Sequence, residues 1–208
     1  QGTEEPIDLT GFVVTDAVKV IRGKKGTEVK LTIKKQDGTI KVISLIRDEI
    51  VQDETFARSA IVRNGSSKIG YIYLPEFYAD FDRPNGNRSY VDVAKEVTKL
   101  KEEKVDGIIM DLRNNGGGYP GTSVEVTSQF ISDGVVLYEK FGDGKQNEFK
   151  ALPGGLATDI PMVVLINEGS ASASEIVAGA LQDYGRAKLI GVVSYGKGSV
   201  QNWIPLSN

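Results

Sequence analysis

Residues 160–175 read Ile160-Pro-Met-Val-Val-Leu-Ile-Asn-Glu-Gly-Ser-Ala-Ser-Ala-Ser-Glu175, an apolar run followed directly by a cluster of serines. The run to Asn167 predicts a buried strand, and the serines open a predicted helix from Ser172 to Tyr184. The same order recurs, with strands expected at 69–74, 105–112 and 189–193 and helices at 89–103 and 122–131. Apolar strands that alternate with helices are typical of an α/β core.

A separate small α+β unit is predicted for residues 1–48, ahead of a core that spans 49–208. It has a helix at 15–21 and strands at 27–35 and 40–46, joined by the hairpin turn Asp37-Gly38. One helix and two strands bury little surface, so the unit looks incomplete on its N-terminal side. The chain starts at Gln1 without a signal-peptide pattern and ends within the pattern of a strand, so we expect truncation at both ends.

The composition excludes several kinds of site. The 208 residues contain no His and no Cys, which rules out a Ser-His-Asp triad, a thiol nucleophile and Cys-ligated zinc. A carboxylate-only Mg²⁺ or Ca²⁺ site stays open at this point, although the acidic residues show no Asp-x-Asp-x-Asp spacing. A net charge of −3 does not suggest nucleic-acid binding. The sequence contains no apolar run of 18 residues, so we expect no membrane-spanning helix.

The serine cluster is a candidate nucleophile site because it lies at a helix N-terminus. Backbone N–H groups there have no intrahelical partner and can stabilise an oxyanion. Serine is also a common helix cap and packs tightly, which is the commoner reason for such a cluster. Spacing alone does not choose among Ser170, Ser172 and Ser174.

A second candidate is the loop Asp111-Leu-Arg-Asn-Asn-Gly-Gly-Gly118, which follows the strand at 105–112. The carboxyl ends of strands in open α/β sheets carry ligands. Three glycines permit positive φ and a close approach of backbone, so their N–H groups could bind an oxyanion or a peptide main chain. The alternative is a loop that only turns sharply.

Without histidine, a lysine is the most plausible base for a serine, and Lys197 stands between two glycines. An amine accepts a proton only when it is neutral, which burial away from counter-charges favours. In an extended segment Lys197 and Gln201 point the same way, with α-carbons about 13 Å apart, so Gln201 can orient the amine. The alternative is a solvated loop lysine. A phosphate-binding loop at 191–198 is rejected because Gly198 has no hydroxyl for Mg²⁺.

Three motifs in this order closely resemble the carboxyl-terminal processing proteases, also called tail-specific proteases. They are Asp111-Leu-Arg-Asn-Asn-Gly-Gly-Gly118, Ser170-Ala-Ser-Ala-Ser-Glu-Ile176 and Gly196-Lys-Gly-Ser-Val-Gln201. The resemblance implies a crotonase/ClpP-like protease core, and residues 1–48 are similar to the later part of that family's PDZ domain. The early strand and the carboxylate-binding loop of a PDZ domain are absent from this chain.

The resemblance also implies an activity and its residues. Ser172 is the nucleophile, Lys197 the base, Gln201 the residue that positions the lysine, and Ala173 and Gly118 the oxyanion donors. The implied enzyme is a Ser-Lys serine endopeptidase without metal or cofactor. It acts on proteins or peptides with apolar C-terminal tails in the bacterial periplasm or cell envelope.

Helix geometry separates Asp183 from the candidate nucleophile. Asp183 is eleven residues after Ser172, about 16 Å along a helix, so we interpret it as structural, paired with an arginine.

The alternative to an enzyme is a non-catalytic peptide-binding scaffold on the same fold. That alternative predicts that Ser172 and Lys197 lie too far apart to share a proton.

Overall fold

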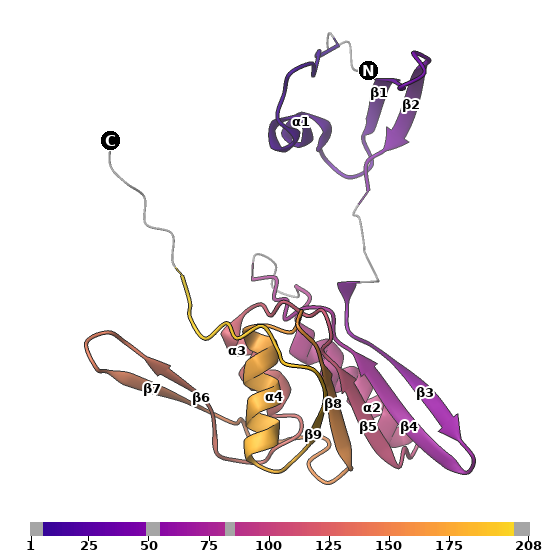
Figure 1. Cartoon of the computed structure of the whole chain (residues 1–208). Helices are drawn as coiled ribbons and strands as arrows, with labels where there is room; N and C mark the ends of the chain where they lie inside the picture. Colours follow the sequence, from indigo (N-terminus) through magenta and orange to yellow (C-terminus); the bar gives the residue numbers. More distant parts are fainter. Residues whose placement is uncertain (1–5, 49–54, 82–85, 202–208) are drawn as a thin grey trace. The chain divides into compact units, whose positions relative to one another are not determined.

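The computed structural model describes residues 6–48, 55–81 and 86–201, and these form a mixed α/β structure (Figure 1). The chain divides into two compact units, Gln1–Gln52 and Asp53–Asn208. No helix in the described part of the chain is long and apolar enough to cross a membrane.

The first unit contains helix α1 (Val14–Ile21) and the antiparallel strands β1 (Glu28–Lys34) and β2 (Ile40–Ile46). The turn between the strands places Gly38 at a φ of 82°, which glycine adopts without strain. None of the described residues of this unit is buried. A lone two-stranded hairpin is marginally stable in water, so this unit does not enclose a core of its own.

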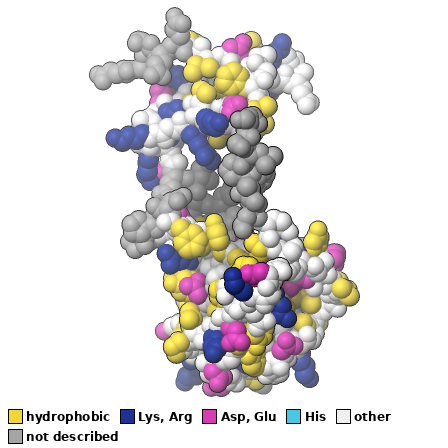
Figure 2. Space-filling view, turned by 90° about the vertical axis from the view of Figure 1, so that its left-hand side faces the viewer, with side chains coloured by type: hydrophobic (Ala, Val, Ile, Leu, Met, Phe, Trp, Pro, Cys, Tyr) yellow, Lys and Arg dark blue, Asp and Glu magenta, His cyan; other side chains and the backbone are white. Residues whose placement is uncertain are grey.

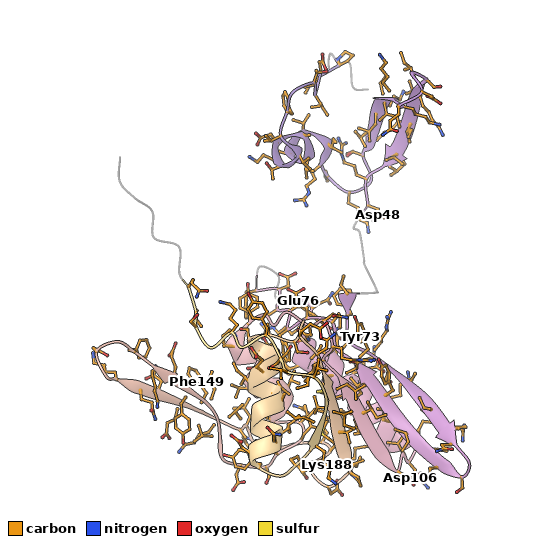
Figure 3. All side chains as sticks on the ribbon, in the orientation of Figure 1. Asp48, Tyr73, Glu76, Asp106, Phe149 and Lys188 are labelled. Carbon is orange, nitrogen blue, oxygen red and sulfur yellow. The ribbon has the colours of Figure 1, made fainter. Side chains whose placement is uncertain are left out.

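The second unit is built on a five-stranded sheet in the order β3-β4-β5-β8-β9. Its strands are β3 (Arg58–Asn64), β4 (Ser67–Tyr73), β5 (Gly107–Asp111), β8 (Met162–Ile166) and β9 (Lys188–Gly191). Only β3 pairs antiparallel, with β4, and the other pairs are parallel. Tyr73 pairs with Asp111 and Asp111 with Leu165, so the parallel strands end at one edge. Tyr73 and Glu76 lie near this edge, and Asp106 and Lys188 lie at the opposite one (Figure 3).

Three helices pack together beside this sheet: α2 (Ser89–Glu102), α3 (Pro120–Thr127) and α4 (Ala173–Asp183). The close packing of α2 depends on Gly70 of β4, because a Cβ there would lie 2.6 Å from Leu100 Cδ1. The fully buried side chains of the core include Ile72, Val97, Leu100, Met110, Val164 and Leu181. On the face drawn in Figure 2, charged side chains and exposed apolar side chains of this unit are interspersed.

Two predicted elements differ from the structure. The sequence of residues 135–152 predicts one strand followed by an exposed loop, but these residues form a hairpin of β6 (Val135–Lys140) and β7 (Gln146–Lys150). Every residue of β7 is exposed, so it lacks the alternating pattern that would predict a strand. Helix α3 starts at Pro120, two residues earlier than expected, because proline fits the first helical position.

Leu181→Ala should destabilise the second unit by about 2–5 kcal/mol, because the side chain is fully buried and its loss leaves a cavity. Leu152→Ala is the matched control: this leucine is 49% exposed and its removal should cost less than about 1 kcal/mol. Urea unfolding followed by circular dichroism measures both. Equal losses would contradict the assigned core.

Candidate active site

The loops that follow β5 and β8 are hydrogen-bonded to each other at the carboxyl edge of the sheet. The Asn114 N–H donates to Asn167 Oδ1 at 2.8 Å, and Asn167 Nδ2 donates to Asn114 Oδ1 at 2.9 Å. The Leu112 N–H donates to the Leu165 carbonyl at 2.9 Å, which extends the strand pairing into the loops. The glycine loop (residues 111–118) and the serine cluster (residues 170–174) are therefore side by side, although more than fifty residues separate them in the sequence.

A buried asparagine supports the glycine loop from within. Asn115 is fully buried; its Nδ2 donates to the Leu74 carbonyl at 2.7 Å and its Oδ1 accepts the Gly117 N–H at 2.9 Å. Its own carbonyl accepts the Ala171 N–H at 3.0 Å and the Ser174 hydroxyl at 2.8 Å. One residue thus joins the glycine loop, the sheet and the serine cluster.

The structure separates the three serines that spacing could not distinguish. Ser170 and Ser174 are fully buried, and their hydroxyls donate to the carbonyls of Leu112 and Asn115. Ser172 is half-buried and precedes the first residue of α4. Its φ of 56° and ψ of −115° are uncommon for a residue with a side chain and carry strain. Ser172 is therefore the serine whose backbone is held in a special conformation.

The glycine loop runs closer to Ser172 than a side chain would permit. Gly117 has a φ of 103°, and a Cβ on it would lie 2.7 Å from the Ala171 carbonyl oxygen and 2.8 Å from Ser172 Cβ. The Ala173 nitrogen would lie 3.1 Å from the same position. The glycine loop therefore packs directly against the turn at Ser172 and the first nitrogen of α4.

Gly118 belongs to a short strand-like contact with Phe77. The Phe77 N–H donates to the Gly117 carbonyl at 2.8 Å, and the Tyr119 N–H donates to the Phe77 carbonyl at 3.1 Å. In a parallel pairing of this kind the N–H of the intervening residue points away from its partner strand. The N–H of Gly118 is therefore directed away from Phe77.

Glu175 joins the serine turn to the segment that carries Lys197. Its Oε2 accepts the Ser172 and Lys197 N–H groups, both at 2.8 Å. Its Oε1 accepts the Ser194 hydroxyl at 2.8 Å and the Gly196 N–H at 2.6 Å. Burial by itself raises the pKa of Glu175, but the bonds from Ser194 and the three N–H groups lower it below its ordinary value.

Lys197 is half-buried, and its amine meets Gln201, as expected from their spacing. Lys197 Nζ donates to Gln201 Oε1 at 2.6 Å and to the Ser199 carbonyl at 3.1 Å. Among the residues that the structure describes, no hydrogen bond joins this amine to Ser172. The backbone nitrogens of Ser172 and Lys197 each lie 2.8 Å from Glu175 Oε2, so the distance between the two nitrogens is at most twice that value. A four-carbon stem can span that separation.

Glu175 stands in the sequence as part of the serine motif, and sequence reasoning alone misses its role. The available signal was Ser172-Ala-Ser-Glu175, the capping-box pattern of a helix N-terminus. That pattern predicts the bond to the Ser172 N–H. It does not predict the bonds to Ser194, Gly196 and Lys197, because their segment comes after the whole helix and strand β9.

Comparison with known proteins decides the family. Residues 68–208 match peptidase family S41. The chain belongs to this family. A carboxyl-terminal-processing protease from a Picosynechococcus species is 33% identical over 201 residues, 96% of this chain and 46% of that protein. A tail-specific protease from Haemophilus influenzae is 35% identical over 211 residues, 97% of this chain and 28% of that protein.

A solved structure of a photosystem II D1 C-terminal processing protease shares the fold. It superposes with a TM-score of 0.63 at 24% sequence identity, over 92% of this chain and 50% of that one. The resemblance to carboxyl-terminal processing proteases is confirmed. The S41 chain described here spans less than half the length of the curated relatives above.

Asp183 lies at the far end of α4 from Ser172 and is exposed. In the described part of the chain no arginine pairs with it, contrary to expectation. Arg186 instead donates to the carbonyls of Phe130 at 2.8 Å, Ala157 at 2.5 Å and Ile160 at 2.6 Å. Within the described ranges no cluster of three or more acidic side chains is arranged to hold a metal ion.

The base of the glycine loop is fixed by a buried carboxylate. Asp111 accepts Arg113 Nη2 at 2.7 Å and the Tyr71 hydroxyl at 2.5 Å, and its side chain is 3% exposed. Burial raises the pKa of Asp111, but the bonds from Arg113 and Tyr71 outweigh burial and hold it below its ordinary value. These bonds therefore fix the backbone where the glycine loop leaves β5.

Gly117→Ala should destabilise the protein by about 1–3 kcal/mol, because alanine at this φ is strained and its Cβ meets backbone. Gly116→Ala is the control in the same loop: its Cβ meets no atom within 4 Å, and the change should stay within about 0.5 kcal/mol. Thermal unfolding of both variants checks this. A Gly117→Ala variant as stable as Gly116→Ala would contradict the close approach.

Proposed function

We propose that the protein is a Ser-Lys serine endopeptidase that cleaves proteins after binding their C-terminal tails. The observation that carries the proposal is the strained Ser172 turn at the start of α4, with the backbone of the glycine loop against it. A nucleophile on such a turn has its oxygen beside the free N–H groups of a helix start.

Each proposed residue has one task in the reaction. The neutral Lys197 amine takes the Ser172 hydroxyl proton while Ser172 Oγ attacks the peptide carbonyl carbon. The N–H groups of Ala173 and Gly118 stabilise the oxyanion that forms. The C–N bond breaks as the leaving amine takes the proton from Lys197, and water then releases the acyl group from Ser172.

The present position of Lys197 corresponds in this proposal to a resting arrangement. Its amine donates to Gln201 and the Ser199 carbonyl, while its backbone is held next to Ser172 through Glu175. In this proposal, rotation of the Lys197 side chain moves the amine from Gln201 to the Ser172 hydroxyl. Hydrogen bonds of catalytic groups often tighten only when substrate binds.

The first unit is proposed to be the later part of a PDZ domain. Its helix and hairpin bury none of their described residues, which fits part of a larger fold. A PDZ domain binds a peptide by adding it as a strand to a sheet edge. We therefore assign the capture of apolar C-terminal tails to the full-length protein, and by the same resemblance we place that protein in the bacterial periplasm or cell envelope.

Ser172→Ala and Lys197→Ala should each reduce cleavage of an unstructured protein with an apolar tail by at least about 1,000-fold, because each removes a partner in the proton transfer. The controls are Ser67→Ala and Lys188→Ala, exposed residues on β4 and β9. Full-length protein is assayed by gel electrophoresis and mass spectrometry. Normal turnover by either site variant would exclude the mechanism and favour a peptide-binding scaffold.

A further inference from the structure

We infer that Glu175 is a positioning residue that holds the backbone of Lys197 at a set distance from Ser172. The inference rests on the proposed function, because it assigns a role within the same site. The carboxylate of Glu175 joins two segments of the chain. One contains Ser172, and the other contains Ser194, Gly196 and Lys197.

A helix cap alone does not account for this arrangement. A glutamate at the third position of a helix needs only the bond to the N–H of the capping residue, here Ser172. Glu175 makes three more bonds, and all three go to a segment about twenty residues downstream. A single oxygen, Oε2, accepts both the Ser172 and the Lys197 N–H at 2.8 Å, which ties nucleophile and base to one atom.

In the described part of the chain, few other contacts fix the segment that carries Lys197. Residues 192–201 lie outside the helices and strands of the structure. Val193 is 86% exposed, Tyr195 70% and Val200 71%, so burial of side chains contributes little to the placement of the segment. The Tyr195 N–H donates to the Ser170 carbonyl at 3.0 Å, and the bonds to Glu175 surround that contact on both sides.

The ionised carboxylate suits this role better than a neutral group. Its two oxygens accept four hydrogen bonds, and hydrogen bonds to an ionised acceptor are about twice as strong as neutral ones. A glutamine in its place keeps one oxygen and turns an NH₂ group toward two donors. Two of the four bonds are then lost, and the Lys197 segment is free to move away from Ser172.

The test compares Glu175→Gln with Glu168→Gln in the full-length protein. Glu168 carries the same charge on the loop just before the serines and is exposed. Glu175→Gln should lower kcat about 100-fold with KM within about threefold, because displacement of a catalytic group by about 1 Å has an effect of that size. Amide exchange at Gly196 and Lys197 should rise about tenfold. Glu168→Gln should change neither quantity.

Two further variants, Ser194→Ala and Ser172→Ala, distinguish failure of the positioning role from failure of the proposed function. Ser194→Ala removes one donor and leaves the carboxylate in place, so kcat should fall about tenfold while the fold persists. If Glu175→Gln does not fold, normal activity of Ser194→Ala overturns the inference and a reduced kcat supports it. Full activity of Glu175→Gln beside an inactive Ser172→Ala overturns the positioning role alone. An active Ser172→Ala instead overturns the proposed function.

Discussion

The backbone of Gly117 lies against the turn at Ser172 with no room for a side chain between them. This contact requires that strands β5 and β8 run parallel in register, so that the loops after Asp111 and Ile166 leave the same edge of the sheet. It also requires Asn115 in the interior, where it holds both loops by their backbones. The rest of the second unit supplies the rigid frame for this approach.

The strained conformation of Ser172 is stable because several neighbours fix it at once. Ala171 before it is tied to Asn115, and the Ser172 N–H itself is tied to Glu175. Strained backbone persists only where the surroundings determine it in this way. Strain of this kind is common at active sites, and here it coincides with the start of a helix that supplies free N–H groups.

Much of this arrangement follows from the sequence because its signals are local. Apolar runs predict the strands, and serines before an apolar helical pattern predict the start of α4. The spacing of Lys197 and Gln201 in an extended segment predicts that their side chains meet, and they do. Family resemblance, rather than spacing, singles out Ser172.

The remaining features depend on contacts between distant residues. The hydroxyls of Ser170 and Ser174 are bound by carbonyls 58 and 59 residues away, so the local sequence cannot exclude either serine as a nucleophile. The four bonds of Glu175 join segments separated by a helix and a strand. Strand β7 is exposed along its whole length, and among the described residues it pairs with its hairpin partner β6 alone, so its sequence carries no pattern of burial.

In the proposed mechanism, Ser172 is a nucleophile activated by Lys197. The most direct measurement of this activation is covalent labelling of the full-length protein with a fluorophosphonate, followed by intact mass and peptide mapping. We expect a single adduct on Ser172 and labelling at least about 100-fold slower in Lys197→Ala. An adduct on another serine, or an equal rate in Lys197→Ala, would contradict it.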